Sequence, residues 1–239
     1  MKRKKKLFVL IPLALIAAGL IFFFADAANG YRAGDAAQQA MQGSDTVSVK
    51  KMDGGWLFDG PSEEKAVIFY PGAKVETTAY APILEGIAEE GAADVFLVEM
   101  PFHYAFFGIN RAKAILANYS YDEWYMAGHS LGAAMAASFA ADHTDEISGD
   151  ILLAGYPPKS LKTDGFRLLS VYGTQDGHTD MLAKGKENRP DDYTEVVISG
   201  GNHAQFGDYG VQKGDGKARI SAQDQWQQTI RAVCDFLRS

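Results

Sequence analysis

The sequence predicts an α/β fold, in which a mostly parallel, twisted sheet carries helices on both faces. The main observation is that short apolar runs alternate along the chain with stretches of helical periodicity, an order that a parallel sheet requires. A second observation is that residues 66–70 and 95–98 are apolar throughout, as expected of strands buried on both faces. The composition, 47% hydrophobic and 22% charged over 239 residues, suffices for one sizeable core.

The expected elements follow one another without a break long enough for a second domain. Strands are expected at 47–51, 56–59, 66–70, 95–98, 124–127, 151–154, 168–172 and 195–198, and helices at 80–90, 109–119, 131–141 and 222–237. A turn signal at residues 53–55 separates the first two strands, and Gly91 ends the first helix. Residues 155–166 form only a loop, so we expect no cap domain.

The first 27 residues predict a membrane anchor or a signal segment. Five of the first six residues are Lys or Arg, and residues 7–24 carry no charge. As a helix this run spans roughly 27 Å, close to the hydrocarbon thickness of a bilayer. We favour an uncleaved anchor, because the run is long for a signal peptide and three phenylalanines precede the candidate cleavage site at residues 25–27. Because the basic flank stays inside, we expect a single-pass protein of the cell membrane with its folded domain outside the cytoplasm, or a secreted protein if the segment is cleaved.

The remaining chain divides into an expected linker and one folded domain. Residues 28–44 are rich in Ala, Gly and Gln and predict a linker or a short exposed helix, and residues 45–239 predict the domain. Without the N-terminal segment the net charge changes from −7 to −11, since five cations and Asp26 are removed. An acidic body repels nucleic acid and anionic lipid, so we expect no nucleic-acid partner.

The segment Gly128-His129-Ser130-Leu131-Gly132 fits the pattern G-x-S-x-G between an expected strand and an expected helix. In such a strand–turn–helix setting the serine sits on a strained turn, and side chains at the two glycine positions would clash with neighbouring backbone. The free N–H groups of the helix N-terminus favour a negative charge beside the serine. The pattern therefore predicts Ser130 as a nucleophile.

A serine nucleophile needs a base and an orienting acid, which follow it along the chain in this arrangement. His203 lies in a glycine-rich loop after the last expected strand, and Asp176 lies in the loop after the preceding strand. Loops at the carboxyl ends of parallel strands gather at one edge of the sheet, so these side chains are expected to meet Ser130. Asp180 is the alternative acid if Asp176 only forms a turn.

The negative charge of a tetrahedral intermediate needs two backbone N–H donors. The residue after the nucleophile, Leu131, is one. The other is expected in the loop after residues 66–70, where we choose Ala73, with Gly72 and Lys74 as neighbouring alternatives.

The segments 69–75, 128–132, 173–176 and 202–207 resemble the α/β-hydrolase superfamily, and within it small lidless bacterial hydrolases related to dienelactone hydrolase and simple carboxylesterases. The likeness covers residues 62–238. It implies a Ser–His–Asp mechanism through an acyl-enzyme with no cofactor. The chain departs from the family at Pro71-Gly72, where His-Gly is frequent, which bears on the second oxyanion donor.

Three further residues are candidate substrate contacts. His129 is the variable position of the serine pattern, Gln205 lies beside the expected base, and Phe102 opens an aromatic segment that forms either a pocket wall or core. Gly214-Asp215-Gly216 predicts a turn, because it lacks the ligand count of a calcium loop, and we expect no metal. The single cysteine, Cys234, excludes an intramolecular disulfide.

These observations lead to the hypothesis of a serine hydrolase that cleaves a small carboxylic ester or thioester. Ser130 is the expected nucleophile, His203 the base and Asp176 the orienting acid. One alternative keeps the triad and changes the reaction to acyl transfer or peptide cleavage at the cell envelope. Another alternative is a non-catalytic binding protein on a hydrolase scaffold.

Overall fold

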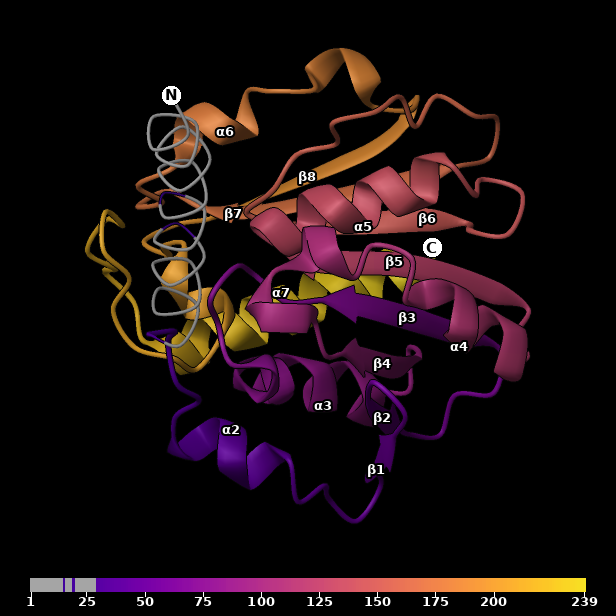
Figure 1. Cartoon of the computed structure of the whole chain (residues 1–239), viewed down its shortest axis with the longest axis horizontal. Helices are drawn as coiled ribbons and strands as arrows, with labels where there is room; N and C mark the ends of the chain where they lie inside the picture. The colour runs from indigo at the N-terminus through magenta and orange to yellow at the C-terminus, as the bar shows by residue number, and fades with distance from the viewer. Residues whose placement is uncertain (1–14, 16–18, 20–28) are drawn as a thin grey trace, which may run out of the picture.

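A computed structural model of the chain describes residues 15, 19 and 29–239. The described chain forms an eight-stranded sheet in the order β1-β2-β4-β3-β5-β6-β7-β8 (Figure 1). The strands are β1 (Ser48–Met52), β2 (Gly55–Asp59), β3 (Lys65–Tyr70), β4 (Asp94–Val98), β5 (Glu123–His129), β6 (Gly149–Leu153), β7 (Arg167–Gly173) and β8 (Asp192–Ile198). The expected anchor at residues 1–27 lies outside the described residues, apart from positions 15 and 19. None of the described helices has the length and hydropathy needed to cross a bilayer.

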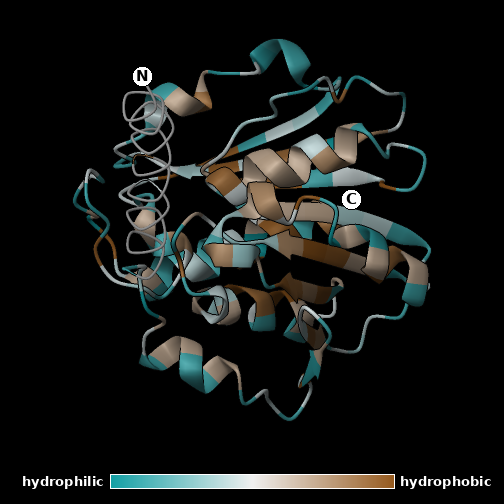
Figure 2. Cartoon of the chain, in the orientation of Figure 1, coloured by the Kyte–Doolittle hydropathy of each residue, from teal (hydrophilic) through white to brown (hydrophobic). Residues whose placement is uncertain are grey.

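Helices cover both faces of the sheet. They are α2 (Asp35–Ala40), α3 (Ala81–Glu89), α4 (Ala112–Asn118), α5 (Leu131–Ala141), α6 (Thr179–Leu182) and α7 (Ala222–Arg238), with short 3-10 turns η1 (Thr77–Tyr80), η2 (Pro101–His103), η3 (Ala105–Phe107), η4 (Lys186–Asn188) and η5 (Ala204–Phe206). Side chains of α2, α3 and α7 share one buried cluster with the sheet, and side chains of α4 and α5 share the other. The strands at the centre of the sheet are the most hydrophobic part of the molecule (Figure 2).

The pairing of the strands decides where their loops end. Strands β3 to β8 run parallel to one another, and β2 joins the sheet antiparallel to β4. The loops that follow β3 to β8 therefore lie on one side of the sheet, which we call the carboxyl edge. The expected α/β class with a mostly parallel sheet is confirmed.

The structure differs from the sequence expectation at residues 28–44. This segment contains the short helix α2, so the alternative of a short helix is correct, but its Ala37 and Ala40 are buried against the domain and the helix is not simply exposed. Asp208 fixes it, because its Oδ2 accepts a hydrogen bond from Ala37 N–H at 2.9 Å. Two alanines three residues apart make a narrow apolar face, which composition alone does not distinguish from a linker.

Asp150 is a buried acid on the central strand β6. It is fully buried, and neither of its carboxylate oxygens has a hydrogen-bond partner of normal geometry within the described part of the chain. Burial raises the pKa of Asp150 well above its ordinary value, because the charged form is deprived of water, and the nearby Ile151 N–H opposes this only in part. The folded state therefore favours the protonated carboxyl group.

We expect Asp150→Asn to change how stability depends on pH. With a raised pKa in the folded state, the free energy of unfolding of the wild type falls as the pH rises above the unfolded value, about 3.9. The variant cannot ionise at this position. Its free energy of unfolding should therefore exceed that of the wild type by roughly 1–3 kcal/mol at pH 8, and this difference should disappear near pH 4. Urea unfolding at pH 4, 6 and 8 measures this, and parallel pH profiles would contradict the interpretation.

Candidate active site

Ser130 occupies a strained turn between β5 and α5. Its backbone has φ 55° and ψ −120°, a conformation that residues other than glycine rarely adopt. The turn needs close backbone contacts, since a Cβ at Gly132 would lie 2.1 Å from the Tyr70 carbonyl oxygen. A Cβ at Gly128 would lie 2.6 Å from Ala133 N. Both glycines of the serine pattern are therefore required by the local packing.

His203 and Asp176 form a buried hydrogen-bonded pair. His203 Nδ1 lies 2.9 Å from Asp176 Oδ2, and both side chains are almost completely buried. Asp176 Oδ1 accepts a second bond from His178 N–H at 2.7 Å. With both carboxylate oxygens engaged and Nδ1 held, Nε2 is the ring nitrogen of His203 that remains to exchange a proton. The alternative acid Asp180 lies exposed on α6.

Three of the expected site residues line one small cavity on the carboxyl edge. Ser130, Leu131 and His203 contribute to a cavity of about 250 Å³, and Asp176 supports His203 from behind. The other described residues that line it are Ala134, Ala154, Gly155, Tyr156, His178, Met181 and Gln212. The cavity thus joins segments that are far apart in the sequence.

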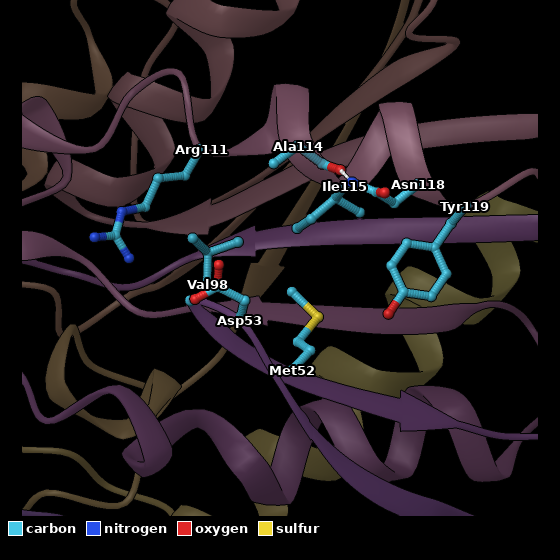
Figure 3. A pocket seen from close by; sticks show the side chains of 9 residues that line it. Met52, Asp53, Val98, Arg111, Ala114, Ile115, Asn118 and Tyr119 are labelled. Atoms are coloured by element: carbon cyan, nitrogen blue, oxygen red, sulfur yellow. Dashed lines mark hydrogen bonds between the residues drawn. The ribbon is translucent and has the colours of Figure 1, made fainter.

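A larger cavity, about 680 Å³, lies between the β1–β2 turn and α4 (Figure 3). Its walls include the apolar side chains of Met52, Val98 and Ile115 together with the charged Asp53 and Arg111. The described residues that line it include no serine, cysteine or histidine. Size therefore does not identify the reactive site, and the smaller cavity beside Ser130 is the candidate.

The loop after β3 contains the expected oxyanion donor. Gly72 N–H donates to the Tyr80 hydroxyl at 3.0 Å, and Lys74 N–H donates to the His103 carbonyl at 2.9 Å. Within the described part of the chain, Ala73 N–H between them has no hydrogen-bond acceptor. Leu131 N–H lies at the start of α5 and likewise has no acceptor among the described residues. Of the three backbone donors considered in this loop, the one at Ala73 remains available to a substrate.

His129 lies beneath the turn and connects it to this loop. Its Nδ1 lies 2.9 Å from the Tyr80 hydroxyl, which also accepts the bond from Gly72. Burial lowers the pKa of His129 well below its ordinary value and raises that of Tyr80, so both groups are neutral. We therefore assign the Tyr80 proton to the bond with His129 Nδ1. His129 supports the site from below and is not among the cavity residues.

The other two candidate substrate contacts also lie away from the cavity wall. Phe102 is half exposed on the loop after β4, with its ring 5.6 Å from that of Phe107. Gln205 Nε2 donates to the Ile220 carbonyl at 3.3 Å, which directs this side chain toward the body of the domain. His178 and Gln212 line the cavity instead. The sequence did offer a signal for His178, because it lies only two residues after the expected acid Asp176.

Asp215 connects the loop of the acid to the loop of the base. Its Oδ1 accepts bonds from Gly177 N–H at 3.1 Å and His203 N–H at 3.2 Å, and its Oδ2 accepts one from Ala204 N–H at 2.8 Å. A carboxylate that accepts several backbone donors fixes their relative positions strongly. The expected turn at residues 214–216 therefore also holds the two loops together.

We expect Asp215→Ala to loosen both loops. The amide hydrogens of Gly177, His203 and Ala204 should exchange with solvent at least about tenfold faster, because charge-assisted bonds are lost. Hydrogen exchange resolved to single residues measures this. The matched control is Asp180→Ala, which removes an exposed acid from α6 and should leave these amides unchanged. Unchanged exchange in Asp215→Ala would show that the loops are held by other contacts.

Residues 66–227 match the model of the alpha/beta hydrolase family, and this range includes Ser130, Asp176 and His203. No curated protein matches the chain. The matched range covers more than half of the chain, and it includes β4 to β8 with nearly all of β3.

Solved structures with the same fold are similar at low identity. Carboxyl esterase 2 from Tuber melanosporum is 10% identical, with a TM-score of 0.58 over 87% of this chain and 91% of that one. A serine hydrolase without a lid from Xanthomonas campestris is 16% identical, with a TM-score of 0.54 over 82% and 97%. Est1E from Butyrivibrio proteoclasticus is 16% identical, with a TM-score of 0.53 over 81% and 100%. These likenesses support the fold, and the family match over residues 66–227 shows that the chain belongs to the alpha/beta hydrolase family.

Proposed function

We propose that the protein hydrolyses a small carboxylic ester or thioester through an acyl-enzyme intermediate. The observation that carries the proposal is the buried pair of His203 and Asp176, whose histidine lines the same cavity as the strained Ser130. A hydrogen-bonded acid and base beside a strained serine are the parts that activate a hydroxyl group. Family membership supports the same reaction class.

In the proposed reaction the Ser130 oxygen attacks the carbonyl carbon of the substrate while His203 Nε2 takes the hydroxyl proton. Asp176 holds the imidazole and stabilises the positive charge that it gains. The N–H groups of Ala73 and Leu131 donate to the oxyanion of the tetrahedral intermediate. His203 then returns the proton to the leaving alcohol or thiol. A water molecule, activated by the same histidine, releases the acid and restores Ser130.

The cavity favours small substrates. Its volume of about 250 Å³ lies just below the usual range of ligand pockets, and Leu131, Ala134 and Ala154 make part of it apolar. His178 and Gln212 add polar groups to the same wall. A solved structure of Est1E, a protein with the same fold, contains ferulic acid, a small carboxylic acid. This supports a substrate with a short or compact acyl group.

The first test removes the nucleophile. Ser130→Ala should lower the hydrolysis of a short-chain p-nitrophenyl ester by at least about a thousandfold and abolish labelling by a fluorophosphonate probe. Ser138→Ala is the matched control, because Ser138 is a buried serine of α5 whose hydroxyl donates to the Ala134 carbonyl. Labelling of Ser130→Ala, or an unlabelled wild type, would exclude the proposed nucleophile. Product analysis with competing alcohols or amines distinguishes hydrolysis from acyl transfer.

The second test concerns the position of the loop after β3, which carries Ala73 and which we call the oxyanion loop. Tyr80→Phe removes the acceptor of Gly72 N–H and the partner of His129, so the loop that carries Ala73 should shift. We expect kcat to fall about tenfold with little change in KM, because oxyanion donors act mainly in the transition state. Steady-state kinetics on the same ester measure both constants.

Tyr125→Phe provides the control for general loss of stability. The Tyr125 hydroxyl donates to Glu123 Oε2 at 2.5 Å near the start of β5, away from the cavity. Both variants should lose about 1–3 kcal/mol of unfolding free energy, and only Tyr80→Phe should lower kcat. Equal kcat values in the two variants would contradict a role of Tyr80 in positioning the loop.

A further inference from the structure

Exposed apolar side chains gather on the carboxyl edge. Among the described residues, the exposed large hydrophobic side chains are Leu15, Phe102, Phe106, Phe107, Tyr119, Met181, Val197 and Val211. Five of them, the three phenylalanines with Met181 and Val211, lie on the segments that follow β4, β7 and β8. Val211 is 92% exposed and directly precedes Gln212, which lines the cavity. Apolar surface that gathers around one site marks an interaction surface.

The three phenylalanines form one continuous aromatic patch. The rings of Phe106 and Phe107 lie 4.2 Å apart, those of Phe102 and Phe107 lie 5.6 Å apart, and each side chain is about half exposed. Their loop is joined to the oxyanion loop by the bond from Lys74 N–H to the His103 carbonyl. The patch is therefore fixed beside the candidate active site.

The N-terminal end of the described domain also lies at the carboxyl edge, beside the oxyanion loop. Tyr31 forms a parallel bridge with Val75, in which Tyr31 N–H donates to the Lys74 carbonyl at 2.7 Å and Glu76 N–H donates to the Tyr31 carbonyl at 2.9 Å. In Figure 1 the indigo start of the domain and the yellow loop after β8 lie on the same side of the sheet. The entry point is thus held against the oxyanion loop.

The position of Tyr31 limits how far the apolar N-terminal run can lie from the active site. Only residues 25–30 separate the uncharged run, residues 7–24, from Tyr31. Even fully extended, this connection spans at most about 25 Å. The end of the run must therefore lie within about that distance of the oxyanion loop.

We propose that the carboxyl edge faces a lipid bilayer, with the aromatic patch and Val211 in contact with its surface, and that the cavity receives an amphiphilic ester from it. The part concerning the ester rests on the proposed function. The length of residues 7–24 and their basic flank suit a bilayer, and the short connection brings that bilayer to this edge. Phenylalanine is among the side chains that peripheral proteins bury at the boundary between headgroups and acyl chains.

The net charge of the domain indicates which type of lipid surface it can contact. From residue 28 onward the net charge is −11, which repels an anionic membrane. Apolar contact with a zwitterionic surface therefore fits better than attraction to anionic lipid. Phosphatidylcholine vesicles are the corresponding probe.

The orientation can be measured without any reaction. In the full-length Ser130→Ala protein, Val211→Cys and Asp191→Cys are each labelled with an environment-sensitive fluorophore and reconstituted in phosphatidylcholine vesicles that contain brominated lipid. Asp191 is the control, because it is exposed and lies directly before β8, at the end of that strand opposite to the carboxyl edge. The native Cys234 is buried, and burial raises its pKa to about 11, so it should not react.

We expect the label at position 211 to be quenched at least about threefold more strongly than the label at position 191. Equal quenching would overturn the proposed orientation, because the carboxyl edge would then lie no closer to the lipid than the opposite edge of the sheet. The comparison does not depend on catalysis, so it remains decisive if the protein hydrolyses no ester.

Delivery of the substrate is tested with two acetate esters, one of a long-chain alcohol held in the vesicles and one of a soluble phenol. Phe106→Ser and Val211→Ser should slow the hydrolysis of the vesicle-held ester at least about fivefold and leave that of the soluble ester unchanged. Val197→Ser should change neither rate. Equal effects on both esters, or none, would overturn delivery from the bilayer. If the wild type hydrolyses neither ester, the proposed function fails, and the quenching experiment still decides the orientation.

Discussion

The close approach of two backbones at the centre of the sheet is the constraint on which the site depends. Helix α5 can begin beneath Ser130 only because Gly132 lies against the carbonyl of Tyr70, with no room for a side chain. This contact keeps the serine in its strained conformation and sets the loop after β3 beside it. The parallel strands then bring the loops of Asp176 and His203 to the same edge.

Much of the fold and part of the site could be predicted from the sequence, because both have local signals. Apolar runs mark buried strands, and the glycines around Ser130 mark a turn with no space for side chains. The chain order of nucleophile, acid and base indicated which loops to compare, and Ser130 and His203 do line one cavity.

The supporting contacts could not be predicted in this way, because their partners are distant in the sequence. Tyr80 meets His129 across 49 positions, and Asp215 meets Gly177 across 38. Periodicity shows which face of an element is buried, and it does not show which way a loop side chain turns. For this reason Gln205 was expected at the substrate, while Gln212 lines the cavity.

The pairing of Tyr31 with Val75 has a practical consequence for work with shortened forms of the protein. Residues 31–44 include α2, which Asp208 fixes to the loop after β8. A fragment that starts at residue 45 would expose the apolar surface under Ala37 and Ala40 and remove a support of the oxyanion loop. A soluble fragment for crystallisation should therefore begin before Tyr31, even though sequence composition suggests that this stretch is dispensable.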